Sequence, residues 1–188
     1  MGRWEPGAGD RLREAALALY LEHGFDQTMV ADIADRAGVT ARTFFRYFAD
    51  KREVLFDRAA EMAEKSLAAL EAAPATMSTL EVVAAALDAA ADLIGHDREL
   101  ARQRHAVIMA NADLRERELI KLAHMSAALA DGLRQRGIDD TEASLAAEAG
   151  SAVYRVAFER WVDADADLDL RDAIRQSFDQ LRALTASP

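Results

Sequence analysis

The chain has 188 residues, of which 51% are hydrophobic and 30% charged, with a formal net charge of −10, three prolines and no cysteine. This length allows one compact domain or a small domain joined to a larger one, and the composition favours helices over sheets. The lack of cysteine excludes disulfide frameworks and thiolate metal sites and indicates a cytoplasmic protein, while the acidic balance argues against wholesale coating of nucleic acid.

Apolar residues recur at helical spacing along almost the whole chain, which predicts an all-α fold of about nine helices. The first helix is predicted from about Asp10 to His23, and Gly24 is well placed to end it. Thr28 is a candidate N-cap for a short second helix. Gly38 would then make the turn that leads to a third helix.

The third helix is predicted over about Thr40–Tyr47, after a three-residue turn that contains a glycine. Two short helices joined in this way form a helix-turn-helix, whose second helix lies in the major groove of DNA. An ordinary helical hairpin is the alternative. The solvent face of the third helix favours DNA, because it combines donors for base edges, hydroxyls for phosphates and an aromatic ring for a thymine methyl. Its residues are Thr40, Ala41, Arg42, Thr43, Phe45, Arg46 and Tyr47.

The segment Arg36–Arg52 is strongly basic in an otherwise acidic chain. It carries five cations, Arg36, Arg42, Arg46, Lys51 and Arg52, against the single acid Asp50. A local basic surface of this kind is expected of a protein that places one small face on a polyanion. Asp50 and Glu53 resemble a capping box that opens a long fourth helix. Lys51 and Arg52 would then lie at a helix N-terminus, where a phosphate is favoured.

The remainder of the chain is also predicted to be helical. Helix starts are expected at Ser78, Asp97 and Asp113, and the last two helices over about Thr141–Val162 and Leu168–Leu184. The most apolar stretch, Leu80–Leu93, is short and contains three acids, so no membrane span is expected. The predicted organisation is a helix-turn-helix DNA-binding domain at 1–52 and a helical ligand-binding and dimerisation domain at 53–188.

The last two predicted helices each present a face of small and apolar residues. These are Leu145, Ala149, Ala152, Val153, Val156 and Ala157 on one helix, and Ile174, Phe178, Leu181 and Leu184 on the other. Two such helices from each of two chains would close a four-helix bundle and form a homodimer. A monomer that buries both faces internally is the alternative.

The run from Thr28 to Leu55 resembles the N-terminal signature of the TetR family of bacterial transcriptional regulators. It contains an Ile-Ala pair, Ala-Gly-Val, a Thr-x-x-Thr helix with aromatic residues, and Phe-x-x-Lys followed by an aliphatic pair. The resemblance implies phosphate contacts at Thr28, Thr43, Tyr47 and Lys51, and positions near base edges at Thr40, Ala41, Arg42 and Phe45. Phe45 departs from the pattern, because the family usually has a tyrosine there.

The resemblance also implies a cavity for a small apolar or amphipathic effector in the second half of the chain. Its candidate lining residues are Leu93, Arg102, His105, Met109, Leu122, Met125 and Phe158. Arg102, Arg104 and His105 would form a cationic cluster able to neutralise an anionic headgroup, such as that of an acyl-CoA or a fatty acid. Ordinary core packing and solvated surface arginines explain the same residues without a ligand.

No catalytic or metal-binding pattern is found in the sequence. The four histidines never occur in a His-Glu-x-x-His or Glu-x-x-His arrangement, and neither a nucleophile elbow nor a phosphate-binding glycine loop is present. A non-enzymatic protein without cofactor or metal is therefore expected. The predicted function is a regulator, by family default a repressor, that leaves a near-palindromic operator when it binds its effector. A ligand-independent architectural DNA-binding protein is the alternative.

Overall fold

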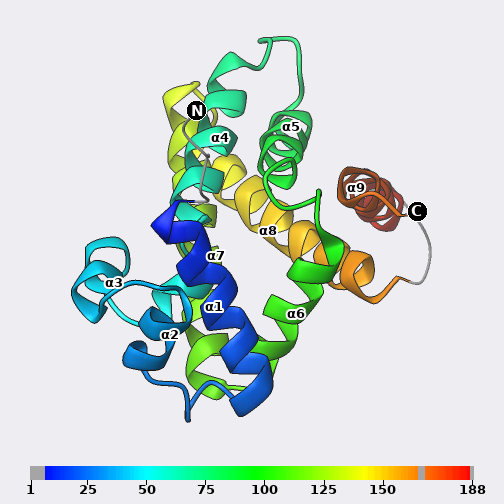
Figure 1. The fold of residues 1–188 in the computed structure, drawn as a ribbon. Helices are drawn as coiled ribbons and strands as arrows, with labels where there is room; N and C mark the ends of the chain where they lie inside the picture. The colour runs from blue at the N-terminus through cyan, green and yellow to red at the C-terminus, as the bar shows by residue number, and fades with distance from the viewer. Residues whose placement is uncertain (1–6, 165–167, 187–188) are drawn as a thin grey trace, which may run out of the picture. The chain divides into compact units, whose positions relative to one another are not determined.

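The computed structural model describes residues 7–164 and 168–186. Within these ranges the chain forms nine α-helices, one 3-10 turn and no strand (Figure 1). The elements are α1 (Ala8–His23), α2 (Val30–Arg36), α3 (Ala41–Tyr47), η1 (Glu53–Leu55), α4 (Ala59–Ala72), α5 (Thr79–Ala91), α6 (Arg98–Met109), α7 (Ala112–Gln135), α8 (Asp140–Asp163) and α9 (Leu170–Ala186). The predicted all-α fold is confirmed. No helix in the described part of the chain is long and apolar enough to cross a bilayer.

The chain divides into two compact units. The first contains the residues up to Asp57 together with Gln103–Glu118, and the second contains Arg58–Arg102 and the residues from Leu119 onward. Helices α6 and α7 therefore contribute to both units. The predicted domain division at residues 52 and 53 stays a prediction, since the units follow packing and not the order of the chain.

The first unit has an apolar core. It is formed by α1, α2 and α3, the C-terminal part of α6 and the N-terminal part of α7. Its members include Leu12, Ala16, Leu19, Ile33, Phe44, Phe48, Val107, Ile108 and Leu114. Helix α1 ends as predicted at Gly24, whose φ of 81° is readily adopted by glycine and whose N–H bonds to the carbonyl of Tyr20 at 3.0 Å.

The predicted N-cap at Thr28 is wrong, because Met29 occupies that position. The Thr28 hydroxyl donates instead to the carbonyls of Gly24 and Leu19, at 2.9 and 3.3 Å. Its side chain therefore satisfies the carbonyl end of α1 and not the amide end of α2. The N–H of Met29 is bonded by the Asp32 carboxylate at 3.0 Å.

The long fourth helix predicted from Asp50 is also wrong. The Asp50 carboxylate accepts from the N–H groups of Arg52 and Glu53, at 2.8 and 3.1 Å, but the next element is η1, and α4 begins only at Ala59. Three consecutive apolar residues explain the break, since Val54, Leu55 and Phe56 are all buried. An α-helix would spread three successive side chains over about 200° of its surface, whereas the short turn directs all three into the core.

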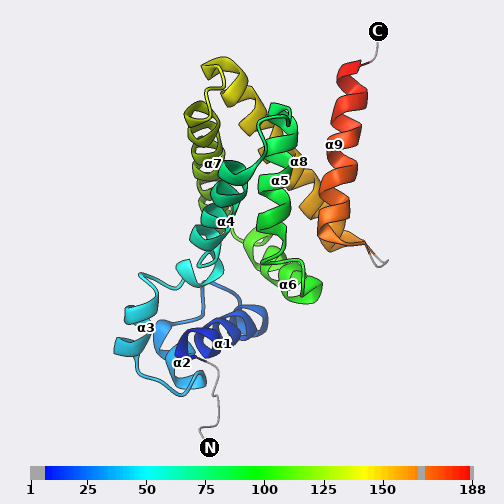
Figure 2. The same ribbon diagram turned by 90° about the horizontal axis from the view of Figure 1, so that it is seen from above.

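The second unit is organised around α5, which contacts α4, α8 and α9, while α8 and α9 lie side by side (Figure 2). A side chain at Gly150 of α8 could not be accommodated, because its Cβ would lie 2.4 Å from Val83 of α5. The capping box of Ser78 and Glu81 is confirmed, with the Ser78 N–H bonded to the Glu81 carboxylate at 2.8 Å.

Helix α6 also begins as predicted, since the Asp97 carboxylate accepts from the N–H of Leu100 at 2.9 Å. Asp113, in contrast, does not cap α7. The side-chain oxygen of Asn111 accepts from the N–H groups of Asp113 and Leu114, at 3.1 and 3.2 Å, so the helix starts two residues earlier than predicted.

Candidate DNA interface

Helix α3 is fixed by its N-cap and by two buried aromatic rings. The Thr40 hydroxyl accepts from the N–H of Thr43 at 3.2 Å, so Thr40 is the N-cap and the helix begins at Ala41, one residue after the predicted start. Phe44 and Phe48 are 0% and 5% exposed and lie 5.5 Å apart between ring centroids. Because these rings anchor one side of the helix in the core, the opposite side faces solvent.

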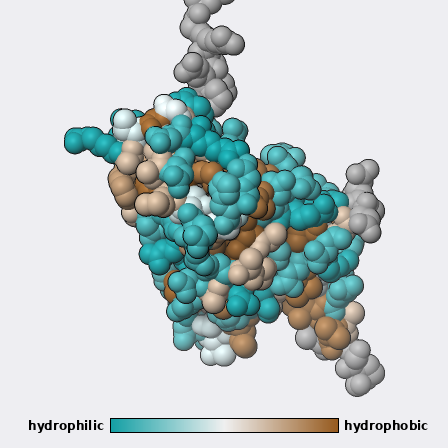
Figure 3. All heavy atoms as spheres, turned by 60° about the horizontal axis from the view of Figure 1, so that its bottom comes forward, coloured by the Kyte–Doolittle hydropathy of each residue, from teal (hydrophilic) through white to brown (hydrophobic). Residues whose placement is uncertain are grey.

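The outer face of α3 carries most of the residues predicted to contact DNA. Thr40, Ala41, Arg42, Phe45, Arg46 and Tyr47 are exposed, and Thr43 is half-buried. Phe45 is 57% exposed although it is fully apolar, and its ring meets the buried Phe44 edge-on at 5.4 Å. Figure 3 shows hydrophilic and hydrophobic residues intermixed on one face of the molecule. The candidate interface is identified by the composition of the exposed side of α3.

The two arginines of α3 form no ion pair among the described residues. In the described part of the chain, Arg42 has no hydrogen-bond or ion-pair partner. Arg46 donates to the Tyr47 hydroxyl at 3.3 Å and lies over that ring, 5.1 Å from its centroid. Neither guanidinium is paired with a carboxylate among the described residues, so both can bind an anion.

Two other cations of the basic segment are already paired with acids. Arg36 makes two bonds to the Glu22 carboxylate, at 2.5 and 2.7 Å, and this contact lowers the pKa of Glu22. Arg52 bonds to Asp50 at 2.7 Å and is the largest cause of the lowered pKa of that carboxyl. The positive surface is therefore smaller than the sequence of the segment indicates.

Lys51 and Thr28 do not lie on the exposed face. The Lys51 ammonium is bonded to three backbone carbonyls, and Thr28 is 2% exposed. Lys51 and Arg52 do not lie at the N-terminus of a long helix, as the sequence predicted, because the element that follows them, η1, is only three residues long. The geometry leaves Thr43, Arg46 and Tyr47 as candidates for phosphate contacts.

Sequence reasoning missed Tyr20 and Asn111, which support this region. The Tyr20 hydroxyl donates to the carbonyl of Lys51 at 2.6 Å, and burial, with a smaller effect of Asp50, raises the pKa of Tyr20 above its ordinary value. Asn111 donates to the Asp26 carboxylate at 3.2 Å. Tyr20 belongs to an ordinary apolar stripe of α1, and nothing in the sequence around Asn111 relates it to Asp26.

The residues predicted to line an effector cavity are not gathered in one compact unit. His105 and Met109 belong to the first unit, whereas Leu93, Arg102, Leu122, Met125 and Phe158 belong to the second. Phe158 is 8% exposed and packs against Trp161 in the core of the second unit. Arg102 donates to the carbonyl of Val162 at 2.8 Å and to Glu99 at 3.2 Å.

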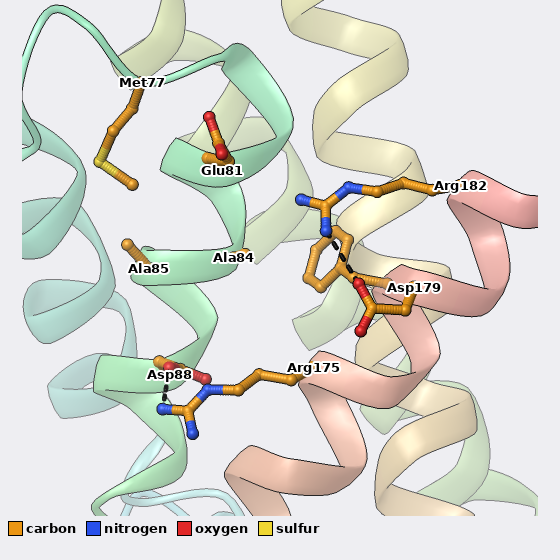
Figure 4. Close-up of a pocket in the computed structure, with 9 residues that line it drawn as sticks. Met77, Glu81, Ala84, Ala85, Asp88, Arg175, Asp179 and Arg182 are labelled. Carbon is orange, nitrogen blue, oxygen red and sulfur yellow. Dashed lines mark hydrogen bonds and ion pairs between the residues drawn. The ribbon is translucent and has the colours of Figure 1, made fainter.

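A different hollow, of about 390 Å³, lies between α5 and α9 of the second unit (Figure 4). It is lined by Met77, Glu81, Ala84, Ala85, Asp88, Arg175, Phe178, Asp179 and Arg182. Its charged groups are largely paired with each other, since Arg175 bonds to Asp88 at 2.9 Å and Arg182 to Asp179 at 3.0 Å. It shares no residue with the predicted cavity. No group of three or more metal-ligating side chains is found among residues 7–164 and 168–186.

Comparisons with known proteins match both halves of the chain. Residues 12–57 match the family described as bacterial regulatory proteins, tetR family, and residues 77–186 match the MftR C-terminal domain. The HTH-type transcriptional regulator TcmR of Streptomyces glaucescens is 34% identical over 186 residues, with 92% of this chain and 82% of that protein covered.

Two solved structures share the fold. One is FadR of Bacillus subtilis in complex with stearoyl-CoA, with 22% identity, a TM-score of 0.61 and coverage of 92% of this chain and 96% of that chain. The other is SmeT, the repressor of the Stenotrophomonas maltophilia multidrug efflux pump SmeDEF, with 17% identity, a TM-score of 0.56 and coverage of 94% and 89%.

The helix-turn-helix, the outer face of α3 and these matches define a DNA-binding transcriptional regulator. The chain belongs to the TetR family, whose members are typically repressors and are not enzymes.

Proposed function

We propose that the chain is a repressor that acts in the cytoplasm as a homodimer on a near-palindromic operator, and that a small amphipathic ligand releases it. The observation that carries this proposal is the outer face of α3, where Arg42 and Arg46 have no carboxylate partner among the described residues and Phe45 is exposed. This face combines hydrogen-bond donors, charge and an apolar ring within two turns of one helix.

Each residue of α3 has a chemically suitable partner in the major groove. Arg42 can donate two hydrogen bonds to the O6 and N7 atoms of a guanine, and the Phe45 ring can contact a thymine methyl. Thr43, Arg46 and Tyr47 suit phosphate oxygens, because they present hydroxyl and guanidinium donors. Thr40 and Ala41 lie at the N-terminal end of α3, and it is the N-terminal residues of a recognition helix that contact base edges.

The dimer is proposed to form through an exposed apolar stripe of α8. Leu145 is 66% exposed and Val156 is 44% exposed, and Ala149 and Ala152 lie between them at helical spacing. The predicted contribution of α9 is not supported to the same extent, because Ile174 and Phe178 are 0% and 1% exposed within the same unit.

A second copy of the chain is the occupant that matches this stripe. Small residues between two larger ones allow two helices to approach closely. Two copies of α3 in a two-fold dimer would contact half-sites about 34–36 Å apart, or a multiple of that spacing.

Replacement of Ala152 by Glu tests the dimer, because it places a carboxylate in the middle of the apolar stripe. The dissociation constant of the dimer is expected to rise about tenfold or more, as measured by sedimentation equilibrium. Ala60→Glu adds the same charge at an exposed position of α4 and should leave the dimer intact. Unchanged association of the Ala152 variant would place the interface elsewhere.

The ligand is proposed to be a molecule with an acyl chain and an anionic headgroup. Support comes from the shared fold with FadR of Bacillus subtilis, whose structure contains stearoyl-CoA. A ligand that binds the folded state raises the melting temperature with its concentration. Stearoyl-CoA, free fatty acids and drug-like cations should therefore be compared in a thermal-shift screen, and an acyl-CoA that stabilises the protein should also release it from DNA.

Selection of the preferred duplex from a random-sequence library tests the DNA-binding proposal. A sequence-specific regulator should enrich a near-palindrome and bind it about a thousandfold or more tightly than random duplex at physiological salt. Equal affinity for both duplexes would favour the architectural alternative.

A further inference from the structure

Three backbone carbonyls converge on one ammonium group in the first unit. The Nζ atom of Lys51 is bonded to the carbonyl oxygens of Phe25 at 2.8 Å, Thr28 at 2.9 Å and Asp26 at 3.3 Å. The same nitrogen lies over the Phe25 ring, 4.4 Å from its centroid. These carbonyls belong to the connection between α1 and α2, the α1–α2 turn (residues 24–29).

The arrangement uses the whole donor capacity of the lysine. An ammonium has three N–H groups and no acceptor, and each N–H here has one carbonyl within reach. Carbonyls that follow the end of a helix have no partner inside the helix, so an external donor stabilises them. A phosphate oxygen could bind Lys51 only by displacing one of these carbonyls.

The backbone of Lys51 is also fixed by a hydrogen bond, and it lies in the chain segment that leaves α3. The residue follows α3 by four positions, and its carbonyl accepts the buried Tyr20 hydroxyl at 2.6 Å. Its side chain thus joins the chain segment leaving α3 to the α1–α2 turn, while its carbonyl joins that segment to the last turn of α1. On the other side of the turn, Asn111 bonds to the Asp26 carboxylate.

We propose that Lys51 is a positioning residue for DNA recognition, which fixes the orientation of α3 through the α1–α2 turn and does not itself bind DNA. This inference rests on the proposed function, because it assigns the orientation of α3 a role in operator binding. It differs from the phosphate contact that the family resemblance implies for Lys51.

Lys51→Arg separates the two roles. A guanidinium binds phosphate at least as well as an ammonium does, but its donors are spread over three nitrogens in a plane and cannot meet three carbonyls that converge on one point. Affinity for the duplex selected by the wild-type protein is therefore expected to fall about tenfold, roughly the effect of losing one good base contact. Affinity for random duplex should stay within about twofold, because the phosphate contacts do not depend on base readout.

Lys51→Met and Lys65→Met complete the set. The first removes all three donors and should lower operator affinity at least as much as Lys51→Arg, at a temperature where circular dichroism shows the variant folded. Lys65 is an exposed lysine of α4, so its replacement controls for the loss of one charge. If Lys51→Met does not fold, the duplex affinities of Lys51→Arg alone distinguish the positioning role from a phosphate contact.

Wild-type operator affinity in Lys51→Arg would overturn the positioning role. A parallel loss on operator and random duplex in Lys51→Met, with the slope of log affinity against log salt flattened by about one unit, would overturn it in favour of a phosphate contact. If the wild-type protein prefers no duplex, the proposed function fails together with this inference. If the wild-type protein prefers a duplex and Lys51→Arg binds it equally well, only the positioning role fails, so the two failures are distinguishable.

Discussion

The arginines of α3 and those of α6 are the same residue type, yet they have different partners. Arg42 and Arg46 have no carboxylate or backbone partner among the described residues, where Arg46 donates one hydrogen bond, to the Tyr47 hydroxyl, and lies over that ring. Arg102 and Arg104, in contrast, donate to backbone carbonyls, of Val162 at 2.8 Å and of Leu55 at 2.6 Å. The first pair is available for a ligand, whereas the second pair holds chain segments in place.

The difference shows that a cluster of cations in a sequence does not by itself indicate a binding site. The carbonyls at the end of a helix need donors, and a long arginine side chain supplies several at once. The carbonyl of Val162, near the C-terminus of α8, is bonded in this way by Arg102. The anionic headgroup proposed for the cluster around Arg102 would have to compete with these carbonyls.

Arg42→Ala is expected to have the largest effect and to act on DNA binding alone. Loss of a bidentate contact to guanine should cost about 1–3 kcal/mol of operator affinity and relax the base preference at that position. The melting temperature without DNA should not change, because Arg42 has no partner within the described chain. Affinity for single-base variants of the selected duplex, measured by fluorescence anisotropy, tests this. An intact base preference would show that Arg42 does not contact a base.

Arg102→Ala is expected to show the opposite behaviour. Removing its donors leaves the carbonyl of Val162 with one partner fewer and should lower the free energy of unfolding by about 1–2 kcal/mol, with allowance for the partial exposure of the side chain. Urea titration measures this change, and operator affinity of the folded variant should remain that of the wild type. Unchanged stability would mean that the side chain is available to a ligand after all.

Arg36→Ala should have the smallest effect, although Arg36 belongs to the same basic segment as Arg42. Its guanidinium is already paired with Glu22 on the surface, so removing it also leaves Glu22 free. Operator affinity should change by no more than about twofold at physiological salt, as expected for an exposed ion pair. A loss as large as that of Arg42→Ala would place Arg36 in the DNA interface and remove the distinction between paired and available cations.

The number and approximate location of the helices could be predicted from the sequence, because periodicity and caps are local signals. The capping residue Ser78 marks the start of α5 to the residue, the start of α3 is predicted to within one residue, and the periodicity of α8 predicts that helix to within one residue at each end. The exposed face of α3 follows from the same periodicity once Phe44 and Phe48 are assigned to the core.

The remaining features depend on contacts between segments that are distant in the sequence. Thr28 and Lys51 both carry polar groups that suit a phosphate, but each bonds to backbone carbonyls. The break before α4 required that Val54, Leu55 and Phe56 all enter one core. No local pattern states whether an apolar face, such as that of Ile174 and Phe178, is covered by its own chain or by a second copy.

The participation of α6 and α7 in the first unit has a practical consequence for protein engineering. Val107, Ile108 and Leu114 are 6%, 0% and 0% exposed in the core that also contains α1 and α3. A fragment that stops after Asp57 would leave the hydrophobic surface under these three side chains bare to water. Chimeras that exchange DNA specificity between relatives should therefore transplant residues 103–118 along with the N-terminal segment, or restore the missing surface by redesign.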